Sequence, residues 1–289
     1  MWTADKIIYN GIDTYIKAYQ GSSLIWEKTI APEDPDDITL PYVTFKAEEA
    51  GSTLGLEKLA SNQMLYFSND KINWNEFEIN TIIHFNEIGT NIYVRGFLTI
   101  DENMTEPEFT QFKMTGKIAA YGNCNALWDY NNLENDVYIG AGMNLFAGCT
   151  SLTKAPKLPA KFVNNYGYAF MFQNCTSLVN APELPATTLG SNCYEGMFQG
   201  CTLLTEGPII PAYTPKNIYA SSIFRHMFSG CTSLSKIIYL NTTMSNTNTT
   251  EWLYNVSPTG TFYKDPSMTD WPTGTSGIPS GWTVLDYTA

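Results

Sequence analysis

The sequence predicts a mainly β protein with short helices: a small N-terminal β module, a β-sandwich-like domain, and a solenoid with a C-terminal β cap. The first observation behind this prediction is a phrase close to Met-Phe-x-x-Cys-Thr-Ser-Leu, which occurs four times. The second is a series of short runs between residues 42 and 138 in which apolar and polar residues alternate, as is typical of strands. The third is the set of Gly, Asn and Asp residues that separates these runs.

Residues 1–30 predict the N-terminal β module. Asn10-Gly11 and Gly21-Ser22-Ser23 separate three short extended runs, and Asn-Gly in this position predicts a hairpin. A unit this small buries little core, so its apolar residues need a partner surface. These candidate anchoring residues are Ile7, Tyr9, Ile16, Tyr19, Leu24 and Trp26. The segment 17–28 resembles a short N-terminal module of phage tail and head appendage proteins, which implies attachment to a particle.

Residues 31–41 predict an acidic linker, because prolines and like charges between Pro32 and Asp37 resist packing. This acidic cluster lacks the alternating ligands and the glycine of a calcium-binding loop, so it predicts a solvated hinge and no metal site. Residues 42–138 predict the β-sandwich-like domain. We also expect this domain to cover the N-terminal end of the solenoid, whose first coil would otherwise expose its core.

Residues 139–240 predict a solenoid of four repeats. The cysteine of the repeated phrase stands at Cys149, Cys175, Cys201 and Cys231, so the spacing is 26, 26 and then 30 residues. A fixed period of this size is typical of a solenoid, because each unit buries its apolar side only against its neighbours.

Each repeat predicts one helical piece followed by one strand. Apolar residues such as Tyr168, Met171 and Phe172 recur at spacings of three and four, which suits one or two turns of helix. The extended run that follows contains a proline in three repeats, and a missing N–H makes a strand short or irregular. These prolines are Pro156, Pro182 and Pro208. The fourth repeat has Ile238 there, so its strand can pair continuously with the chain that follows.

The repeated phrase, extended to Met-Phe-x-x-Cys-Thr-Ser-Leu-x-x-Ala-Pro-x-Leu-Pro-Ala, resembles the BspA-like, cysteine-containing leucine-rich repeats. Proteins of this family occur on the surface of gut bacteria and in virions of their phages. The resemblance covers residues 139–240 and implies a leucine-rich-repeat solenoid. It also implies adhesion or presentation in general, and it transfers no catalytic residue.

The four repeated cysteines predict a ladder of buried thiols, in which each thiol acts as a small apolar group of one coil. Disulfides between coils are the alternative, but four equivalent positions would rarely all satisfy the required dihedral angle. Zinc is less favoured still, because the chain has no Cys-x-x-Cys pair. Cys124 and Cys193 lie outside the ladder, and we expect Cys193 to be a further packing residue.

Residues 241–289 predict the C-terminal cap. Two strands are expected, one from Gly260 to Lys264 and one from Ile278 to Leu285. We expect Trp271 and Trp282 to cover the last coil, because a solenoid end without a lid exposes its core to water. The Gly-Thr-Phe-Tyr and Pro-x-Gly-Trp sequences of this tail extend the resemblance to the repeat family.

The sequence predicts a non-enzymatic protein that needs no cofactor and no metal. His84 and His226 are far apart, and no carboxylate pair, phosphate-binding loop or nucleophile elbow is present. The net charge of −12 argues against nucleic acid as a ligand. No segment is long and apolar enough to predict membrane insertion. The first residues lack the pattern of a signal peptide, which favours release of the protein in phage particles by lysis.

Two hypotheses about function follow. The first is a virion appendage of a tailed phage that attaches by residues 1–30, self-associates, binds other virion proteins and displays its solenoid to a host glycan or protein. The alternative is a bacterial cell-surface adhesin whose export signal has been removed, and a glycan-degrading enzyme is a distant third. Strand-borne side chains are the expected contacts of the solenoid: Thr153, Lys154, Lys157, Asn180, Glu183, Glu206, Lys236 and Tyr239.

Overall fold

The computed structural model describes the backbone of residues 6–9, 15–20 and 23–29, and all atoms of residues 34–61, 63–98, 108–133 and 136–288. The chain divides into two compact units, Met1–Asp37 and Ile38–Ala289, and each is described by itself. The boundary between them falls inside the acidic segment that the sequence marks as a linker. Within the described residues, no helix has the length and apolar character needed to cross a membrane.

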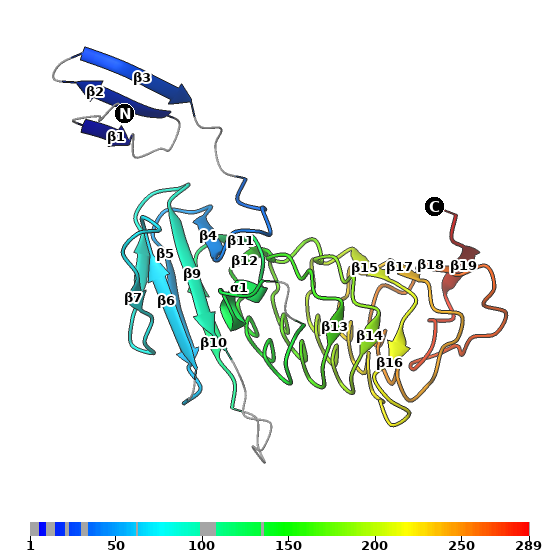
Figure 1. Cartoon of the computed structure of the whole chain (residues 1–289). Coiled ribbons are helices and arrows are strands. Elements are labelled where there is room, and N and C mark those ends of the chain that lie inside the picture. The colour runs from blue at the N-terminus through cyan, green and yellow to red at the C-terminus, as the bar shows by residue number, and fades with distance from the viewer. Residues whose placement is uncertain are drawn as a thin grey trace. The chain divides into compact units, whose positions relative to one another are not determined.

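The first unit is a three-stranded antiparallel sheet (Figure 1). Its strands are β1 (Lys6–Tyr9), β2 (Tyr15–Gln20) and β3 (Ser23–Thr29), paired in the order β1-β2-β3. The sequence predicts three strands at these places. The Asn10-Gly11 turn lies outside the described residues. The side chains of the six candidate anchoring residues, Ile7, Tyr9, Ile16, Tyr19, Leu24 and Trp26, also lie outside what the structure describes.

The second unit opens with two β-sheets that enclose a core, as the alternating pattern predicts. One sheet has the order β12-β11-β4-β9-β6-β7 and the other β10-β5-β8. Their bounds are β4 (Val43–Ala47), β5 (Ser52–Lys58), β6 (Met64–Ser68), β7 (Asn75–Glu76), β8 (Ile83–Phe85), β9 (Asn91–Phe97), β10 (Gln111–Thr115), β11 (Ile118–Tyr121) and β12 (Leu152–Lys154). In β9, Ile92 and Val94 are buried while Tyr93 and Arg95 are half-buried, because successive side chains point to opposite faces.

The sandwich continues into the solenoid without a break in the core. Strand β12 of the first coil pairs in parallel with β11 of the sandwich. The N–H of Phe112 on β10 donates to the carbonyl of Leu145 at 2.8 Å, and Val137 forms a parallel bridge with Val163. The sandwich therefore covers the N-terminal end of the solenoid, which confirms the expectation from the sequence.

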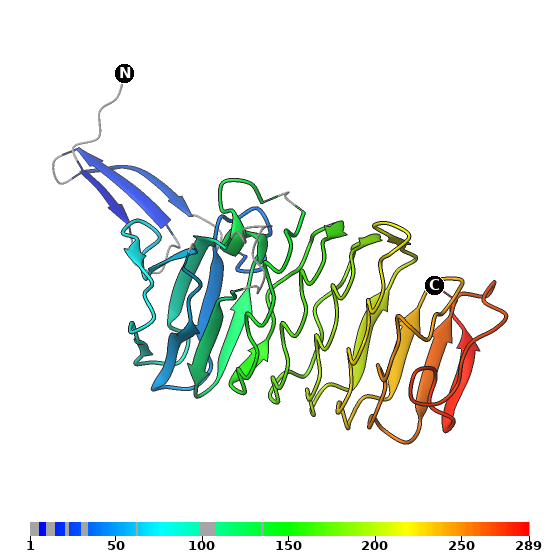
Figure 2. The same ribbon diagram turned by 90° about the horizontal axis from the view of Figure 1, so that it is seen from below.

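Each coil of the solenoid has three sides (Figure 2). The first side carries the parallel strands β12, β15 (Glu206–Ile210), β17 (Lys236–Tyr239), β18 (Gly260–Lys264) and β19 (Trp282–Asp286). The second side carries the parallel strands β13 (Phe162–Val163), β14 (Thr188–Leu189) and β16 (Thr214–Pro215). The third side consists of consecutive turns at residues 140–148, 166–174, 192–200, 222–230 and 248–255, called here the turn ribbons of coils 1 to 5.

Proline limits the strands of the first side as the sequence predicts. Strand β12 ends at Lys154, before Pro156, and residues 178–184 around Pro182 form no strand. Strand β15 contains Pro208, and its register with β17 shifts at that point. Strand β17, with Ile238 in place of proline, pairs residue for residue with β18.

Two columns of aromatic rings run through the core of the solenoid, and their neighbouring rings are stacked except for the tilted pair of Trp128 and Tyr168. Neighbouring ring centroids lie 5.2 to 5.6 Å apart in the first column and 5.9 to 6.1 Å apart in the second. The first column contains Phe112, Phe146, Phe172, Phe198 and Phe228, and the second contains Trp128, Tyr168, Tyr194 and Phe224. Since Phe112 also packs on Phe45, the first column begins inside the sandwich.

Trp252 ends both aromatic columns. Its ring centroid lies 6.3 Å from those of Phe224 and Phe228, and its indole N–H donates to the carbonyl of Gly277 at 3.0 Å. Of the two predicted lids, Trp282 is buried, covers Gly260 of the fifth coil and donates its indole N–H to the Ser257 carbonyl at 2.8 Å, whereas Trp271 is only partly buried. The two predicted strands exist as β18 and β19, but residues 241–264 continue the solenoid by a fifth coil before the chain closes it.

The helical turns predicted for each repeat are absent from the described residues, and turn ribbons stand in their place. The single helix of the described residues is α1 (Asn125–Trp128), which is buried beside the second aromatic column. Residues 166–174 contain left-handed positions that an α-helix of L-residues excludes. This stretch is therefore a turn ribbon, although its apolar residues keep helix-like spacings.

Candidate binding surface

In coils 1 and 2, the turn ribbons satisfy all their backbone donors by alternating between two kinds of partner. In coil 2, the even-numbered residues from Tyr166 to Asn174 donate to carbonyls of coil 3 at 2.7 to 2.9 Å. The odd-numbered residues from Gly167 to Cys175 donate to the carbonyl three residues back, at 3.0 to 3.2 Å. The ribbons of coils 1 to 4 are thus hydrogen-bonded both to themselves and to the next ribbon, which makes this side of the solenoid a rigid surface.

Every fourth residue of a ribbon has a left-handed backbone, with φ between +50° and +78°. These residues form three rows that run along the solenoid. The first row contains Gly140, Tyr166, Asn192 and Ser222; the second contains Asn144, Phe170, Gly196, His226 and Glu251; the third contains Gly148, Asn174, Gly200, Gly230 and Asn255. Glycine and asparagine dominate the third row, since they adopt this conformation at least cost. Within one ribbon, glycine and asparagine recur every fourth residue, as at Gly140, Asn144 and Gly148. The helical interpretation of the sequence missed this signal.

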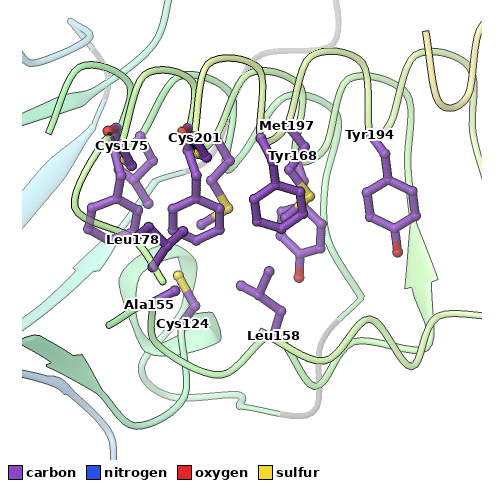
Figure 3. Close-up of a cluster of buried hydrophobic side chains, with 14 of the residues drawn as sticks. Cys124, Ala155, Leu158, Tyr168, Cys175, Leu178, Tyr194, Met197 and Cys201 are labelled. Atoms are coloured by element: carbon purple, nitrogen blue, oxygen red, sulfur yellow. Dashed lines mark hydrogen bonds between the residues drawn. The ribbon is translucent and has the colours of Figure 1, made fainter. Parts of the chain in front are cut away.

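The thiol ladder supports the ribbons from inside the core (Figure 3). All four ladder cysteines are buried and unoxidised, as are Cys124 and Cys193. Each ladder thiol donates to the carbonyl of the stacked phenylalanine one coil back: Cys149 to Phe112, Cys175 to Phe146, Cys201 to Phe172, and Cys231 to Phe198, at 2.9 to 3.3 Å. The thiols are therefore hydrogen-bond donors as well as the small apolar groups that the sequence predicts.

Burial controls the protonation of these thiols. It raises the pKa of Cys149 and Cys201 to about 12, from an ordinary value of 9.0. Burial also raises the pKa values of Cys175 and Cys231 well above that value. A thiol that stays protonated is a poor nucleophile and a poor metal ligand, so the ladder is structural.

The outer surface of the ribbons carries a depression of about 280 Å³ that spans coils 2 to 5. Its lining consists of two adjacent positions from each of these four coils. They are Gln173 and Asn174, Gln199 and Gly200, Ser229 and Gly230, and Tyr254 and Asn255. The Gln173 amide donates to the Gln199 side-chain oxygen at 2.7 Å, which ties two coils together along the floor. The lining contains amides, a hydroxyl and a phenol, and no charged group.

The strand-borne contact residues expected from the sequence occupy equivalent places on the first side of the solenoid. Lys154, Asn180, Glu206 and Lys236 form one row, since they share a repeat position. Lys236 pairs with Glu206 at 2.8 Å, and the Lys154 ammonium lies 4.1 Å from the centre of the Tyr121 ring. Several of these groups therefore have partners within the protein.

The remaining residues of that set lie in three different environments. Thr153 donates to the Glu48 carboxylate at 2.7 Å, whereas Lys157, Asn180 and Glu183 are exposed. Tyr239 does not belong to a contact surface, because its side chain is fully buried. Strand alternation places it on the core face of β17, where its hydroxyl donates to the carbonyl of Thr243 at 3.0 Å.

A second hollow, of about 440 Å³, lies where the sandwich meets the first coil. Its lining includes Ile38, Asn123, Asn125, Asp136 and Lys161. The Asn123 amide donates to the carbonyls of Ile38 and Leu133, and the Asp136 carboxylate accepts from the Phe162 N–H at 3.2 Å. These polar groups hold loops of the protein together, whereas in the ribbon depression Gln173 and Gln199 are the lining side chains with a hydrogen bond to the described part of the protein.

Side chains that could serve in catalysis or metal binding are not clustered in the described residues. His84 is exposed on β8, while His226 lies on the second ribbon row, 3.5 Å from the Glu251 carboxylate. No group of three or more potential metal-ligating side chains occurs in the described part of the chain. Comparison of the sequence and structure with models of known families, with curated proteins and with solved structures found no match.

Proposed function

We propose that this chain is a non-enzymatic display protein, in which a small N-terminal unit attaches to a larger assembly and a rigid solenoid presents a binding surface. The assembly we propose is the virion of a tailed phage, with the protein as a tail or head appendage. The ligand is then a molecule of the host surface. The repeats are proposed to be leucine-rich repeats of the BspA-like type.

The observation that carries this proposal is the contrast between the two compact units. Residues 38–289 share one continuous core, from Phe45 in the sandwich through the aromatic columns to Trp252. Residues 1–37 form a separate three-stranded unit. A three-stranded sheet of this size needs a further surface to be stable, which supports its assignment as the attachment device. Attachment in several copies, to one another and to other virion proteins, is the expected arrangement.

Particle incorporation tests the proposal. Particles from a host culture that carries the gene are purified on a density gradient, and mass spectrometry detects the chain in the particle fraction. A version without residues 1–37 should fold but be absent from particles, whereas residues 1–40 fused to an unrelated domain should be incorporated. Recovery of the intact chain in the cell-envelope fraction alone would contradict the virion assignment and support the cell-surface adhesin.

A further inference from the structure

We infer that the ribbon depression of coils 2 to 5 is a binding site for an uncharged carbohydrate chain that lies along the solenoid axis. This inference rests on the proposed display function, to which it adds a ligand class and a location. It places the site on the turn ribbons and not on the strand side that the sequence suggests.

The chemistry of the lining favours a neutral ligand rich in hydroxyl groups. Side-chain amides of Gln173, Asn174, Gln199 and Asn255 each offer both a donor and an acceptor, as do the hydroxyl groups of sugars. No lining residue carries a charge that could compensate a carboxylate, a phosphate or an ammonium group. An ionic ligand would lose hydration here without gaining an opposite charge.

The polar groups of the depression are available for a ligand. Within the described residues, the side chains of Asn174, Tyr254 and Asn255 make no hydrogen bond to the protein. The bond between Gln173 and Gln199 uses one donor and one acceptor, and it leaves the Gln173 oxygen and the Gln199 amide nitrogen for a ligand. These groups belong to rigid ribbons, so little conformational entropy is lost when they bind.

The shape of the depression suits an extended chain with flat apolar faces. Gly230 has no side chain, so a sugar ring can approach the backbone closely there, whereas the Asn174 carboxamide lies over Gly200. The Tyr254 ring, 53% exposed, lies at one end, where it can stack against the C–H face of a sugar. Four coils at the usual strand spacing of about 4.8 Å give a length of roughly 14 Å, enough for more than one sugar ring.

Binding of neutral hexasaccharides of glucose, mannose, galactose and N-acetylglucosamine tests the inference on the full chain. Saturation-transfer NMR detects binding, and titration gives the Kd, with oligogalacturonate as the charged comparison. We expect at least one neutral chain to bind and the charged one not to bind. Tyr254→Ala should raise the Kd about ten-fold. Asn174→Gly and Asn255→Gly should each raise it about five-fold.

Glycine is the replacement of choice at Asn174 and Asn255, because both have a left-handed backbone that alanine would strain. The matched control is Asn144→Gly, which makes the same change at φ +57° outside the depression. Tyr219→Ala removes a tyrosine that is even more exposed, at 81%, and lies outside the depression. Both controls should bind as the unmodified protein does, and thermal melting of every variant verifies folding.

Three results would overturn the inference: no neutral chain binds, the charged chain binds better, or the controls weaken binding as much as the depression variants do. These results are separable from a failure of the proposed function. A chain that enters particles but binds no neutral glycan keeps the display role and loses this ligand. A chain that binds the glycan but is absent from particles keeps the site and loses the virion assignment.

Discussion

Each ladder cysteine has two roles in the solenoid, one in packing and one in hydrogen bonding. Its thiol fills space between coils where a larger group would separate them, and it donates to a phenylalanine carbonyl of the preceding coil. That carbonyl also accepts the N–H of its own turn, as Phe146 accepts from Cys149. The sequence predicts the burial of these residues from their spacing. The hydrogen bond depends on which carbonyl faces the thiol, and only the structure shows that.

The raised pKa values of the buried thiols predict a loss of stability at alkaline pH. Thiols of the unfolded chain ionise above pH 9, whereas Cys149 and Cys201 in the folded protein stay protonated until about pH 12. The unfolded state therefore releases protons first, and the free energy of unfolding falls as the pH rises from 9 towards 12. Each thiol contributes a limiting slope of about 1.4 kcal/mol per pH unit, and the full stability is present below pH 9.

Cys201→Ala isolates this effect. Urea unfolding at pH 8, 9, 10 and 11 in the presence of a reductant should give the variant a shallower decline than the unmodified protein, by about one thiol's slope. The variant should also be less stable at pH 8, because it has lost a buried contact and a hydrogen bond. Buried tyrosines contribute equally to both proteins and cancel in the comparison. Parallel declines would show that Cys201 ionises in the folded state.

Trp252 should be the most sensitive single residue of the C-terminal half, because it ends both aromatic columns and is fully buried. Trp252→Ala should lower the free energy of unfolding by about 3–5 kcal/mol in urea titrations. Trp252→Phe keeps much of the packing but leaves the Gly277 carbonyl without its donor, at a cost of about 1–3 kcal/mol. Tyr254→Ala, two residues away and exposed, is the control and should change little.

At the scale of elements, the turn ribbon shows where inference from sequence succeeds and where it fails. The spacing of Tyr168, Met171, Phe172 and Cys175 is that of a helix face, and these four residues do line the core. The same spacing arises in a ribbon whose backbone turns left-handed at every fourth residue. Helical and ribbon backbones cannot be told apart from apolar periodicity alone. Gly148, Gly200 and Gly230 in one row carry the information that distinguishes them.

The strands were predictable because their limits have a local cause. Proline removes a donor wherever it stands, so the ends of β12 and the missing strand at residues 178–184 follow from Pro156 and Pro182. The depression of the candidate site was not predictable in this way. Its eight residues come from four coils, and which ribbon side chains stay without partners depends on the path of the backbone between them.

The left-handed rows predict that asparagine is tolerated better than alanine at Gly230, whose φ is +78°. A Cβ at this position would meet its nearest atom at 3.6 Å, so steric overlap is absent and only backbone strain remains. Gly230→Ala should therefore cost about 1–2 kcal/mol. Gly230→Asn should cost less, as Asn174 occupies the equivalent position of coil 2. Urea unfolding of the two variants checks this order, and equal losses would contradict it.

The second unit as a whole has a single core that begins in the sandwich and continues past Trp252 to Phe262, Ile278 and Trp282. Phe112 is the link between its two parts, since it stacks on Phe146 and packs on Phe45. Because β11 pairs with β12, the sandwich is also the first layer of the solenoid. The division between residues 42–138 and residues 139–240 is thus a change of architecture inside one compact unit.

Removal of residues 241–289 should destroy this unit. The truncation deletes Trp252 and leaves Phe228, Leu234 and Ile237, all fully buried in the intact chain, at an open end. We expect aggregation or loss of cooperative thermal melting, followed by circular dichroism. Removal of residues 1–37 is the control, and it should leave the Tm of the remaining chain unchanged. A soluble C-terminal truncation with an unchanged Tm would show that the fifth coil is dispensable.

The constant 26-residue period of coils 1 to 3 has a consequence for how such a gene can change. The turn ribbons of coils 2 and 3 present the same hydrogen-bonding edges to their neighbours, so recombination between their coding segments would add or delete one whole coil and leave the ribbon bonds at both junctions intact. The rod would then lengthen or shorten in steps of about 4.8 Å, with its two ends unchanged. The number of coils would then set the length of the solenoid, while the N-terminal unit and the C-terminal cap stay the same. Variation among descendants of this gene would therefore appear first as copy number.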